Sequence, residues 1–543
     1  MKTQKVIHVL IVLLCFVSLP RARAVIPPPD GGYPGFNTAE GTRALQNLGS
    51  GVANSGLGWY SLFTDSTASY NTAVGAGTLA LNDADENTAI GAGALLLNAT
   101  GTGNTATGAL ALLYNTVGNS NTANGVIALQ NNTTGSENTG NGSGALTSNT
   151  TGSQNTAIGA STLVANTAGD DNTAVGFAAL FQNTASGNTA VGSLALRNTT
   201  AQGNTAIGAQ ALFDNATGEF NTATGFGALL HNTTNANTAH GTFALQNNTT
   251  GFGNTGVGAQ ALQSNQTGEH NTAGGYQALL FDTANDNTAY GYQTLVANTA
   301  GFGNVAVGSL ALLSNVTGSG NTAIGVGALN SNTSGASNIA IGINAGANLT
   351  TGTGNIDISN QGAAGESLTT RIGDFQSRAF IAGIRGVTTG NADAIPVFVD
   401  SAGQLGTMSS SRRFKQEVTP MDNASEAILA LKPVTFHYKS DNTKRPQFGL
   451  IAEEVAAVNP DLVVRDQNGD IYTVRYDAVN AMLLNEFLKE HRKVQELEAT
   501  VAEQKQGMQV VMARLEEQAA QIQKVTARIE IAEPTLRVIA RKH

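Results

Sequence analysis

Three adjacent hydroxyls, Ser409, Ser410 and Ser411, precede a lysine, Lys415, in the C-terminal part of the chain. A serine hydroxyl attacks a carbonyl only when a base removes its proton, and a lysine amine that is withdrawn from water can act as that base. Such a pair needs neither a histidine nor an aspartate. Spacing alone does not select one of the three serines, and solvated linkers contain the same kinds of residue. The residues therefore indicate either a Ser-Lys nucleophile or an exposed linker.

The composition of the chain changes at this point. No lysine lies between Lys5 and Lys415, and the long upstream part is repetitive and weakly charged, whereas the downstream part is charged and mixed. A lysine loses its proton near neutral pH only where water is excluded. We therefore expect the downstream domain to supply the pocket that desolvates Lys415.

That downstream domain has the pattern of a small α/β unit. Ala424 to Leu431 is helical in pattern and ends before Pro433, and Val434 to Tyr438 alternates like a strand. Gly449 to Ala452 is a further strand candidate that leads into a helix with two glutamates at its start. Acidic residues are favoured at a helix start, so we prefer that role for the glutamates over a role in the pocket.

The stretch 477–532 has the pattern of one long helix, which Pro534 is expected to end. Apolar residues recur in heptads along it, with position a held by Phe487, Val494, Val501, Met508, Leu515, Ile522 and Ile529. Sustained heptads predict a coiled coil over 487–532, and hence self-association. Gln504 and Gln518 fall at position d, where they lower stability but restrict the register and the number of strands.

Four motifs follow one another in this region: Ser410 to Lys415, Leu431 to Tyr438, Gly449 to Val455, and Tyr476 ahead of the long helix. In this order they resemble the peptidase S74 domain. That domain is the C-terminal intramolecular chaperone of phage tail spikes and fibres such as endosialidase, and it also occurs in some bacterial surface proteins. The resemblance covers roughly the last quarter of the chain.

Members of that family trimerise, template the fold of the fibre upstream, and then cut themselves just before the serine. The resemblance implies a single-turnover serine endopeptidase that cleaves the Ser409-Ser410 bond, with Ser410 as nucleophile and Lys415 as general base. It also implies three strands in the coiled coil, and therefore a homotrimer. The family usually has Asp after the serine, where this chain has Ser411. Folding help without cutting is the alternative.

Upstream, twenty asparagines from Asn37 to Asn355 recur every sixteen or seventeen residues. Each opens a unit that reads approximately Asn-Thr-Ala-(Val/Ile)-Gly-x-x-Ala-Leu-x-x-Asn-Thr-Thr-Gly-x-x. A unit this short cannot bury its own core and must stack on its neighbours. Two strand-like pieces per unit, such as Thr156 to Gly159 and Thr162 to Val164, predict a parallel β-solenoid or β-roll. The frequent glycines argue against a helix, and the strict register argues against disorder.

The repeated asparagines predict ladders of amide hydrogen bonds from coil to coil, and glycan attachment at the Asn-x-Thr triplets is the alternative. The unit also resembles the head repeats of trimeric bacterial adhesins, most closely at Asn338 to Gly342. That resemblance implies a left-handed roll packed three together. A row of threonines after the asparagines offers a surface to a carbohydrate or another cell-surface ligand, although threonine is also a good strand residue.

The N-terminus has the pattern of a secretory signal. Lys2 and Lys5 precede an apolar run from Val6 to Leu19, and small residues favour cleavage after Ala24. The run is short for a spanning helix, and a retained anchor is the alternative. Cys15, the only cysteine, lies inside this signal, so the mature chain is expected to have no thiol, disulfide or thiolate metal site.

Loss of the four cations of the signal changes the formal charge from −10 to −14. An acidic exported chain is a poor candidate for binding nucleic acid. The histidines lack metal-site spacing and no phosphate-binding loop is found, so we expect no metal and no cofactor. We also expect no integral membrane span once the signal is removed.

Together these patterns predict a mostly β chain with a small α/β chaperone domain and a C-terminal coiled coil. The expected segments are a signal peptide 1–24, a Pro-rich lead 25–36, β-solenoid repeats 37–365, a β-rich connector 366–408, the S74 domain 409–505 and the coiled coil 487–532, which overlaps the end of the S74 domain. We expect an exported trimeric fibre or adhesin-like protein, secreted or at a bacterial-type cell surface, whose tail drives trimerisation and then cuts itself. A fibre with an uncut tail as a permanent trimer clamp is the alternative.

Overall fold

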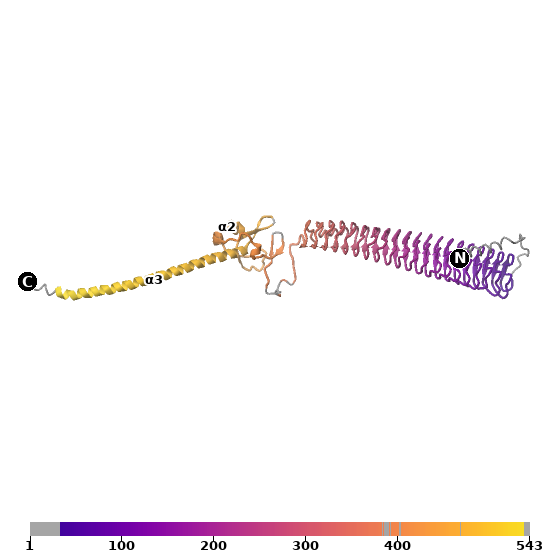
Figure 1. Cartoon of the computed structure of the whole chain (residues 1–543), viewed down its shortest axis with the longest axis horizontal. Coiled ribbons are helices and arrows are strands. Elements are labelled where there is room, and N and C mark those ends of the chain that lie inside the picture. Colours follow the sequence, from indigo (N-terminus) through magenta and orange to yellow (C-terminus); the bar gives the residue numbers. More distant parts are fainter. Residues whose placement is uncertain are drawn as a thin grey trace, which may run out of the picture. The chain divides into compact units, whose positions relative to one another are not determined.

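The computed structural model describes residues 33–536, except 383, 385–389, 391, 392, 401, 402 and 467, and leaves out the side chains of 531–536. The predicted signal peptide, with Cys15, and most of the predicted Pro-rich lead lie outside the described residues. The chain divides into two compact units, Met1–Ala379 and Phe380–His543, and each is described by itself. Figure 1 shows the coils of the first unit and the long helix of the second.

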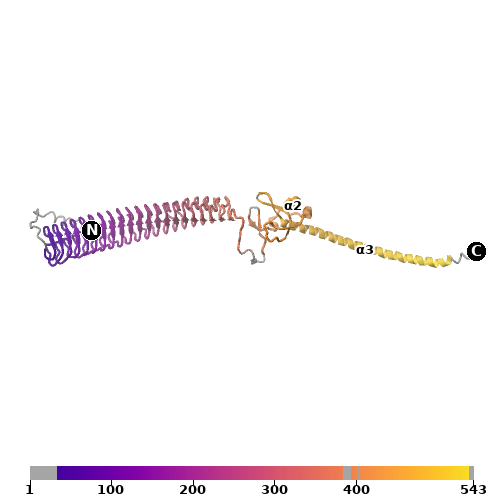
Figure 2. The same cartoon turned by 180° about the vertical axis from the view of Figure 1, so that it is seen from behind.

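The first unit is a parallel β-solenoid, so the fold predicted from the repeat is confirmed. Its 21 strands form one sheet, in which each strand pairs in parallel with that of the next coil (Figure 2). The strands are β1 Thr38–Glu40, β2 Ser55–Leu57, β3 Thr72–Val74, β4 Thr88–Ile90, β5 Thr105–Thr107, β6 Thr122–Asn124, β7 Thr139–Asn141, β8 Thr156–Ile158, β9 Thr173–Val175, β10 Thr189–Val191, β11 Thr205–Ile207, β12 Thr222–Thr224, β13 Thr238–His240, β14 Thr255–Val257, β15 Thr272–Gly274, β16 Thr288–Tyr290, β17 Val305–Val307, β18 Thr322–Ile324, β19 Ile339–Ile341, β20 Ile356–Ile358 and β21 Thr370–Ile372.

Each coil has one strand, and the prediction of two was wrong. The second expected piece, Thr162 to Val164, is a turn in which Leu163 has a left-handed backbone, with φ of 50°. That conformation costs roughly 1–2 kcal/mol for a residue with a side chain. Leu163 is fully buried, and burial of a leucine contributes about 1.5–3 kcal/mol, which offsets the cost. The leucine pattern therefore reports burial, and it does not report extended structure.

The interior of the solenoid is narrow because the inward residue of nearly every strand is alanine. In β8, Thr156 is half-buried, Ala157 is fully buried and Ile158 is exposed. The alanines pack against the row of turn leucines in one continuous core. Thr and the third strand residue therefore face outward, and a large residue has no room at the strand centre.

The glycine after each strand has a steric reason. Gly142 has φ of 146°, and a Cβ added there would lie 2.3 Å from the carbonyl oxygen of Gly159 in the next coil. Backbones of successive coils meet at this corner without intervening side chains. The repeated Val/Ile-Gly pair therefore marks the corner at which the chain leaves the sheet.

Two buried ladders of asparagine side chains join the coils, as predicted. In the first, the backbone N–H and Nδ2 of Asn155 both donate to Oδ1 of Asn138, at 3.1 Å each. In the second, Nδ2 of Asn149 donates to Oδ1 of Asn132 at 2.8 Å. Asn132 belongs to an Asn-x-Thr triplet but is fully buried, so the ladder role holds there and a glycan does not fit.

Asn138→Ala should loosen the array locally. The side chain of Asn138 accepts from the backbone N–H of Asn155 at 3.1 Å and donates to the carbonyl of Gly152 at 2.8 Å. Alanine leaves the N–H of Asn155 unpaired in the interior, whereas the Gly152 carbonyl still accepts from Nδ2 of Asn149 at 2.8 Å. A buried unpaired group costs about 1–3 kcal/mol, so we expect local opening to become easier by about that amount. Hydrogen exchange of β7 and β8 measures it. The exposed Thr151→Ala in the same coil is the control, and equal protection in both variants contradicts the ladder role.

The second unit contains short helices and three antiparallel strand pairs. Its elements are β22 Phe398–Val399, β23 Leu405–Gly406, the 3-10 helices η1 Arg412–Phe414 and η2 Asp422–Ala430, β24 Val434–Phe436, β25 Gln447–Gly449, α2 Ala452–Val458, the 3-10 helix η3 Pro460–Leu462, β26 Val463–Arg465, β27 Ile471–Val474 and α3 Tyr476–Leu536. Of the β-rich connector predicted over 366–408, β22 and β23 lie in this unit. A small core of Val455, Leu462, Val463, Val474 and Met482 lies beneath α2 and the start of α3.

Helix α3 is continuous and extends past Pro534 to Leu536, so the expected stop at Pro534 was wrong. A proline has a helical φ and removes only one hydrogen bond, which the last turn of a helix tolerates. The apolar residues at heptad positions a and d, from Phe487 to Ile529, are 47–65% exposed in the single chain. Among the described residues, we find no helix with both the length and the apolar character needed to cross a bilayer.

Candidate functional site

Ser410 and Lys415 lie on either side of one helical turn, η1. Two backbone bonds of 3.1 Å close this turn: the N–H of Phe414 donates to the carbonyl of Ser411, and the N–H of Lys415 donates to that of Arg412. Ser411 itself is extended, with φ of −64° and ψ of 138°, and its hydroxyl does not cap the helix. The local sequence thus places the predicted nucleophile and base on one short, turned segment.

This segment is open to water. Every residue from 403 to 424 is exposed, including Ser409, Ser410 and Lys415. An ammonium surrounded by water keeps its proton at neutral pH and does not act as a base. The desolvating pocket expected for Lys415 is therefore not formed within one chain. The physical reason is that the core of this unit lies against α2, β26 and α3 and leaves η1 uncovered.

The exposed surface around η1 is apolar and cationic. Met408, Phe414 and Val418 are each more than half exposed, and the guanidinium of Arg413 lies 4.6 Å from the centroid of the Phe414 ring. Apolar residues that gather on an exposed segment indicate a contact surface more often than a free one. A partner that covered them would also remove water from Lys415.

One histidine and two glutamates near this segment lie where ordinary structural roles account for them. His437 is exposed just after β24, where the Phe436 ring packs edge-on against Tyr438 at 5.2 Å. Glu453 and Glu454 lie in the first turn of α2, where the helix dipole favours acidic residues. A cleft of about 240 Å³ lies beside Glu454, but neither Ser410 nor Lys415 lines it.

A second group of polar residues was missed by the sequence reasoning. Ser425 of η2 is fully buried and donates to Glu486 of α3, and Nδ2 of Asn485 donates to the Ser425 hydroxyl at 2.7 Å. The Lys489 ammonium lies 2.7 Å from Glu486 and 3.4 Å from the Ser425 hydroxyl. The hydrogen bond from Lys489, with a smaller one from Ser425, holds the pKa of Glu486 below its usual value.

This group is a second Ser-Lys pair, but its surroundings suit a structural role. Lys489 forms an ion pair with Glu486 at 2.7 Å, so its amine is engaged by a carboxylate. Ser425 has no exposed surface on which a peptide could approach it. The cluster instead ties η2 to the start of α3. The only sequence signal for it is a Glu and a Lys three residues apart on the helix, which is too common to be informative.

The described residues contain no group of three or more side chains that would suit a metal ion. His231 contacts Asp214 at 3.1 Å and His270 lies 3.6 Å from Asp286, each on the surface of the solenoid. Each pair offers one histidine and one carboxylate, which is short of a usual metal-ligand set.

Comparison with known families identifies the segment that contains η1. Residues 410–464 match the family Peptidase S74, described as chaperone of endosialidase. The match begins at Ser410 and extends into β26, so the resemblance seen in the sequence is confirmed for this C-terminal region behind a long β-solenoid. A comparison with curated proteins found no match to the chain.

Proposed function

We propose that this chain is an exported, tail-fibre-like homotrimer whose C-terminal region assembles three chains and then separates by cutting the Ser409-Ser410 bond. The observation that carries the proposal is the position of the family match. It begins at Ser410, the residue that becomes the new N-terminus of the tail after such a cut. The solenoid upstream is the product that remains.

The apolar stripe of α3 supports self-association. Its a and d residues are about half exposed or more, whereas the interior of the same unit buries residues of the same types. Helices that bury such a stripe against each other gain roughly 25 cal/mol for each Å² of apolar surface removed from water. Three parallel copies of α3 bury the stripe and bring the three η1 segments into register.

Assembly also supplies what a single chain lacks at the site. Lys415 is exposed in one chain, and Met408, Phe414 and Val418 around it are apolar and exposed. Contact between neighbouring copies through these residues excludes water from the amine and lowers its proton affinity. Cutting is thereby coupled to correct assembly, because Lys415 is exposed to water in an unassembled chain.

The proposed reaction has two steps, transfer of the Ser409 acyl group to the Ser410 oxygen and hydrolysis of the resulting ester. The amine of Lys415 takes the proton of the Ser410 hydroxyl, whose oxygen attacks the carbonyl carbon of Ser409. A C–O bond forms, the C–N bond to Ser410 breaks, and the leaving amine receives the proton from Lys415. Water then hydrolyses the ester, which leaves a carboxylate on Ser409 and restores the hydroxyl. The cut leaves the folded solenoid kinetically trapped, because its folding template has gone.

The solenoid is proposed as the shaft that meets a cell-surface or carbohydrate ligand. Its threonines face outward on one sheet, in parallel register from coil to coil. The competing proposal for the whole chain is a permanent clamp in which no bond is cut. Intact-mass measurement of the exported protein separates the two: the clamp retains Ser409 and Ser410 in one polypeptide, and the self-cutting fibre gives two fragments that meet at that bond.

Ser411→Asp should speed the cut. A carboxylate next to Ser410 stabilises the ammonium that forms when Lys415 takes the proton. Each decrease of about 1.4 kcal/mol in the activation free energy raises the rate about tenfold. We expect at least about a tenfold gain in the time course of fragment formation on a denaturing gel. Ser411→Asn has the same size without the charge and is the matched control. Equal rates for Asp and Asn at this position contradict the electrostatic role.

A further inference from the structure

The inward column of alanines in the solenoid ends in a carboxylate. Asp357 occupies the centre of β20, in register with Ala340 of β19 on one side and Arg371 of β21 on the other. Its side chain is 0% exposed. The last coil, residues 355–373, therefore carries an ionisable group where the other coils carry a methyl group or a hydrogen atom.

Both carboxyl oxygens of Asp357 lack a hydrogen-bond partner among the described residues. Two glycines make room for this carboxyl: a Cβ on Gly362 would lie 2.9 Å from Oδ2, and one on Gly346 would lie 3.3 Å from it. An ionised carboxylate without hydrogen bonds is strongly disfavoured in an interior, and such a group binds a proton instead. The arrangement seen is therefore that of a neutral Asp357.

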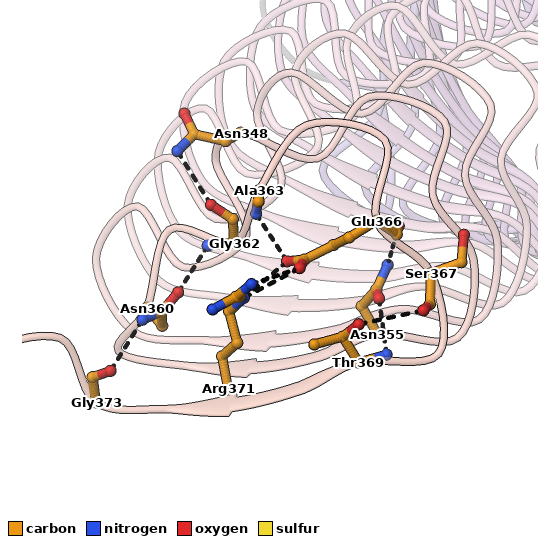
Figure 3. A network of polar contacts seen from close by, with 10 residues as sticks. All are labelled: Asn348, Asn355, Asn360, Gly362, Ala363, Glu366, Ser367, Thr369, Arg371 and Gly373. Carbon is orange, nitrogen blue, oxygen red and sulfur yellow. Dashed lines mark hydrogen bonds and ion pairs between the residues drawn. The ribbon is translucent and has the colours of Figure 1, made fainter. Parts of the chain in front are cut away.

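The nearby cation is held by a different carboxylate. Nε of Arg371 donates to both oxygens of Glu366, at 3.0 and 3.1 Å, and Nη2 donates to Oε2 at 2.8 Å. Figure 3 shows this pair together with the N–H of Ala363, which donates to Oε1 of Glu366 at 2.7 Å. Glu366 also continues the asparagine ladder, because its carbonyl accepts from Nδ2 of Asn355 at 3.0 Å. The Arg371–Glu366 pair thus closes the last coil.

We propose that Asp357 is a proton-binding site that controls the closure of the last coil of the solenoid. With the proton bound, Arg371 stays on Glu366 and the coil is closed. Without it, Asp357 competes with Glu366 for the one guanidinium, the turn at Ala363 loses its anchor, and the coil opens. The neighbours Leu329, Ala340 and Leu349 carry no charge, so Glu366 and Arg371 are the described charged groups that act on Asp357.

The direction of the pH dependence follows from these surroundings. Burial, and then the charge of Glu366, raise the pKa of Asp357 from 3.8 to about 6, while Arg371 opposes the rise. Because the folded-state pKa lies above the unfolded value, the proton stabilises the coil fully below about pH 4. This stability is lost as the pH rises through about 6. The coil is therefore expected to be closed in acid and to open towards neutral pH.

Hydrogen exchange of the full chain, corrected for intrinsic exchange rates, tests the proposal. Between pH 4 and pH 6 we expect opening of residues 355–373 to rise by up to about tenfold per pH unit, with interior coils such as β8 unchanged as the internal reference. Asp357→Asn keeps the shape but does not titrate, so its last coil should show no pH dependence. Asp357→Ala places at the centre of β20 the alanine that most other strands have there, and the last coil of this variant should stay closed over the whole pH range.

Two results overturn the proposal. In the first, the wild type shows no more pH dependence in the last coil than Asp357→Asn does. In the second, millimolar calcium closes the wild-type coil at pH 8, which assigns the site to a metal cation in place of a proton. Neither result bears on cutting at Ser410, which the fragment analysis measures separately.

Discussion

Ser410→Ala should leave the exported chain in one piece, whereas the wild type should separate into a solenoid fragment that ends at Ser409 and a tail that begins at Ser410. The variant lacks the oxygen that attacks the Ser409 carbonyl. Loss of the nucleophile in serine hydrolases lowers the rate on the order of a million-fold, which amounts to no cutting over days. Intact-mass measurement of the exported protein gives both the size of the fragments and the position of the cut.

Neighbouring residues provide matched controls for this experiment. Ser409→Ala and Ser411→Ala each remove one hydroxyl of the same cluster and should still be cut. Lys415→Ala should stay whole, and so should Lys415→Arg, because arginine keeps the charge but does not give up its proton. A Ser410→Ala chain that is still cut, beside a Ser409→Ala or Ser411→Ala chain that stays whole, would move the nucleophile to another serine. A wild type that never separates leaves only the clamp.

The solenoid was predictable because its determinants are local and repeated. Most coils place a buried asparagine, an inward alanine and a corner glycine at the same offsets, so twenty copies average out the ambiguity of any one. The error lay at the leucines. An apolar residue such as Leu163 has the same sequence pattern in a strand and in a turn, and its left-handed backbone is decided by packing against the next coil.

The exceptions to the repeat were not predictable, because no other copy repeats them. Asp357 stands where the pattern asks for alanine, and one substitution in a long array carries no signal until its neighbours are known. Only the fold shows that Gly346 and Gly362 give it space and that Arg371 is opposite it in register. Departures from a repeat are thus the positions at which structure adds most to sequence.

The candidate site was also predictable only in part. Local sequence marks Ser410 and Lys415 as a candidate pair, but it does not give their exposure, which depends on which surfaces the rest of the domain covers. The cluster of Ser425, Glu486 and Lys489 joins residues about sixty positions apart, so no spacing rule finds it. In the proposed mechanism water is excluded from Lys415 by neighbouring copies, and a single sequence describes only one chain.

The proposed role of assembly predicts the second large effect: Val501→Asp together with Leu515→Asp should convert the proposed trimer into a monomer. Both residues lie at position a of α3 and are more than half exposed in the single chain. In a three-stranded coil each substitution would place three carboxylates together in the apolar seam. Removal of such unpaired charges from water costs several kcal/mol, so the seam would not form. Light scattering during gel filtration measures the mass of the particle.

The matched control is Gln506→Asp together with Ala520→Asp, which adds the same charges at position f on the outer face of the helix and should remain a trimer. In the proposed mechanism neighbouring copies exclude water from Lys415, so the seam variant should also stay uncut, although Ser410 and Lys415 are intact. A seam variant that is monomeric yet cut at Ser410 would show that one chain desolvates its own lysine. A seam variant that stays trimeric would place the assembly contacts outside α3, on the surface around η1 or on the solenoid.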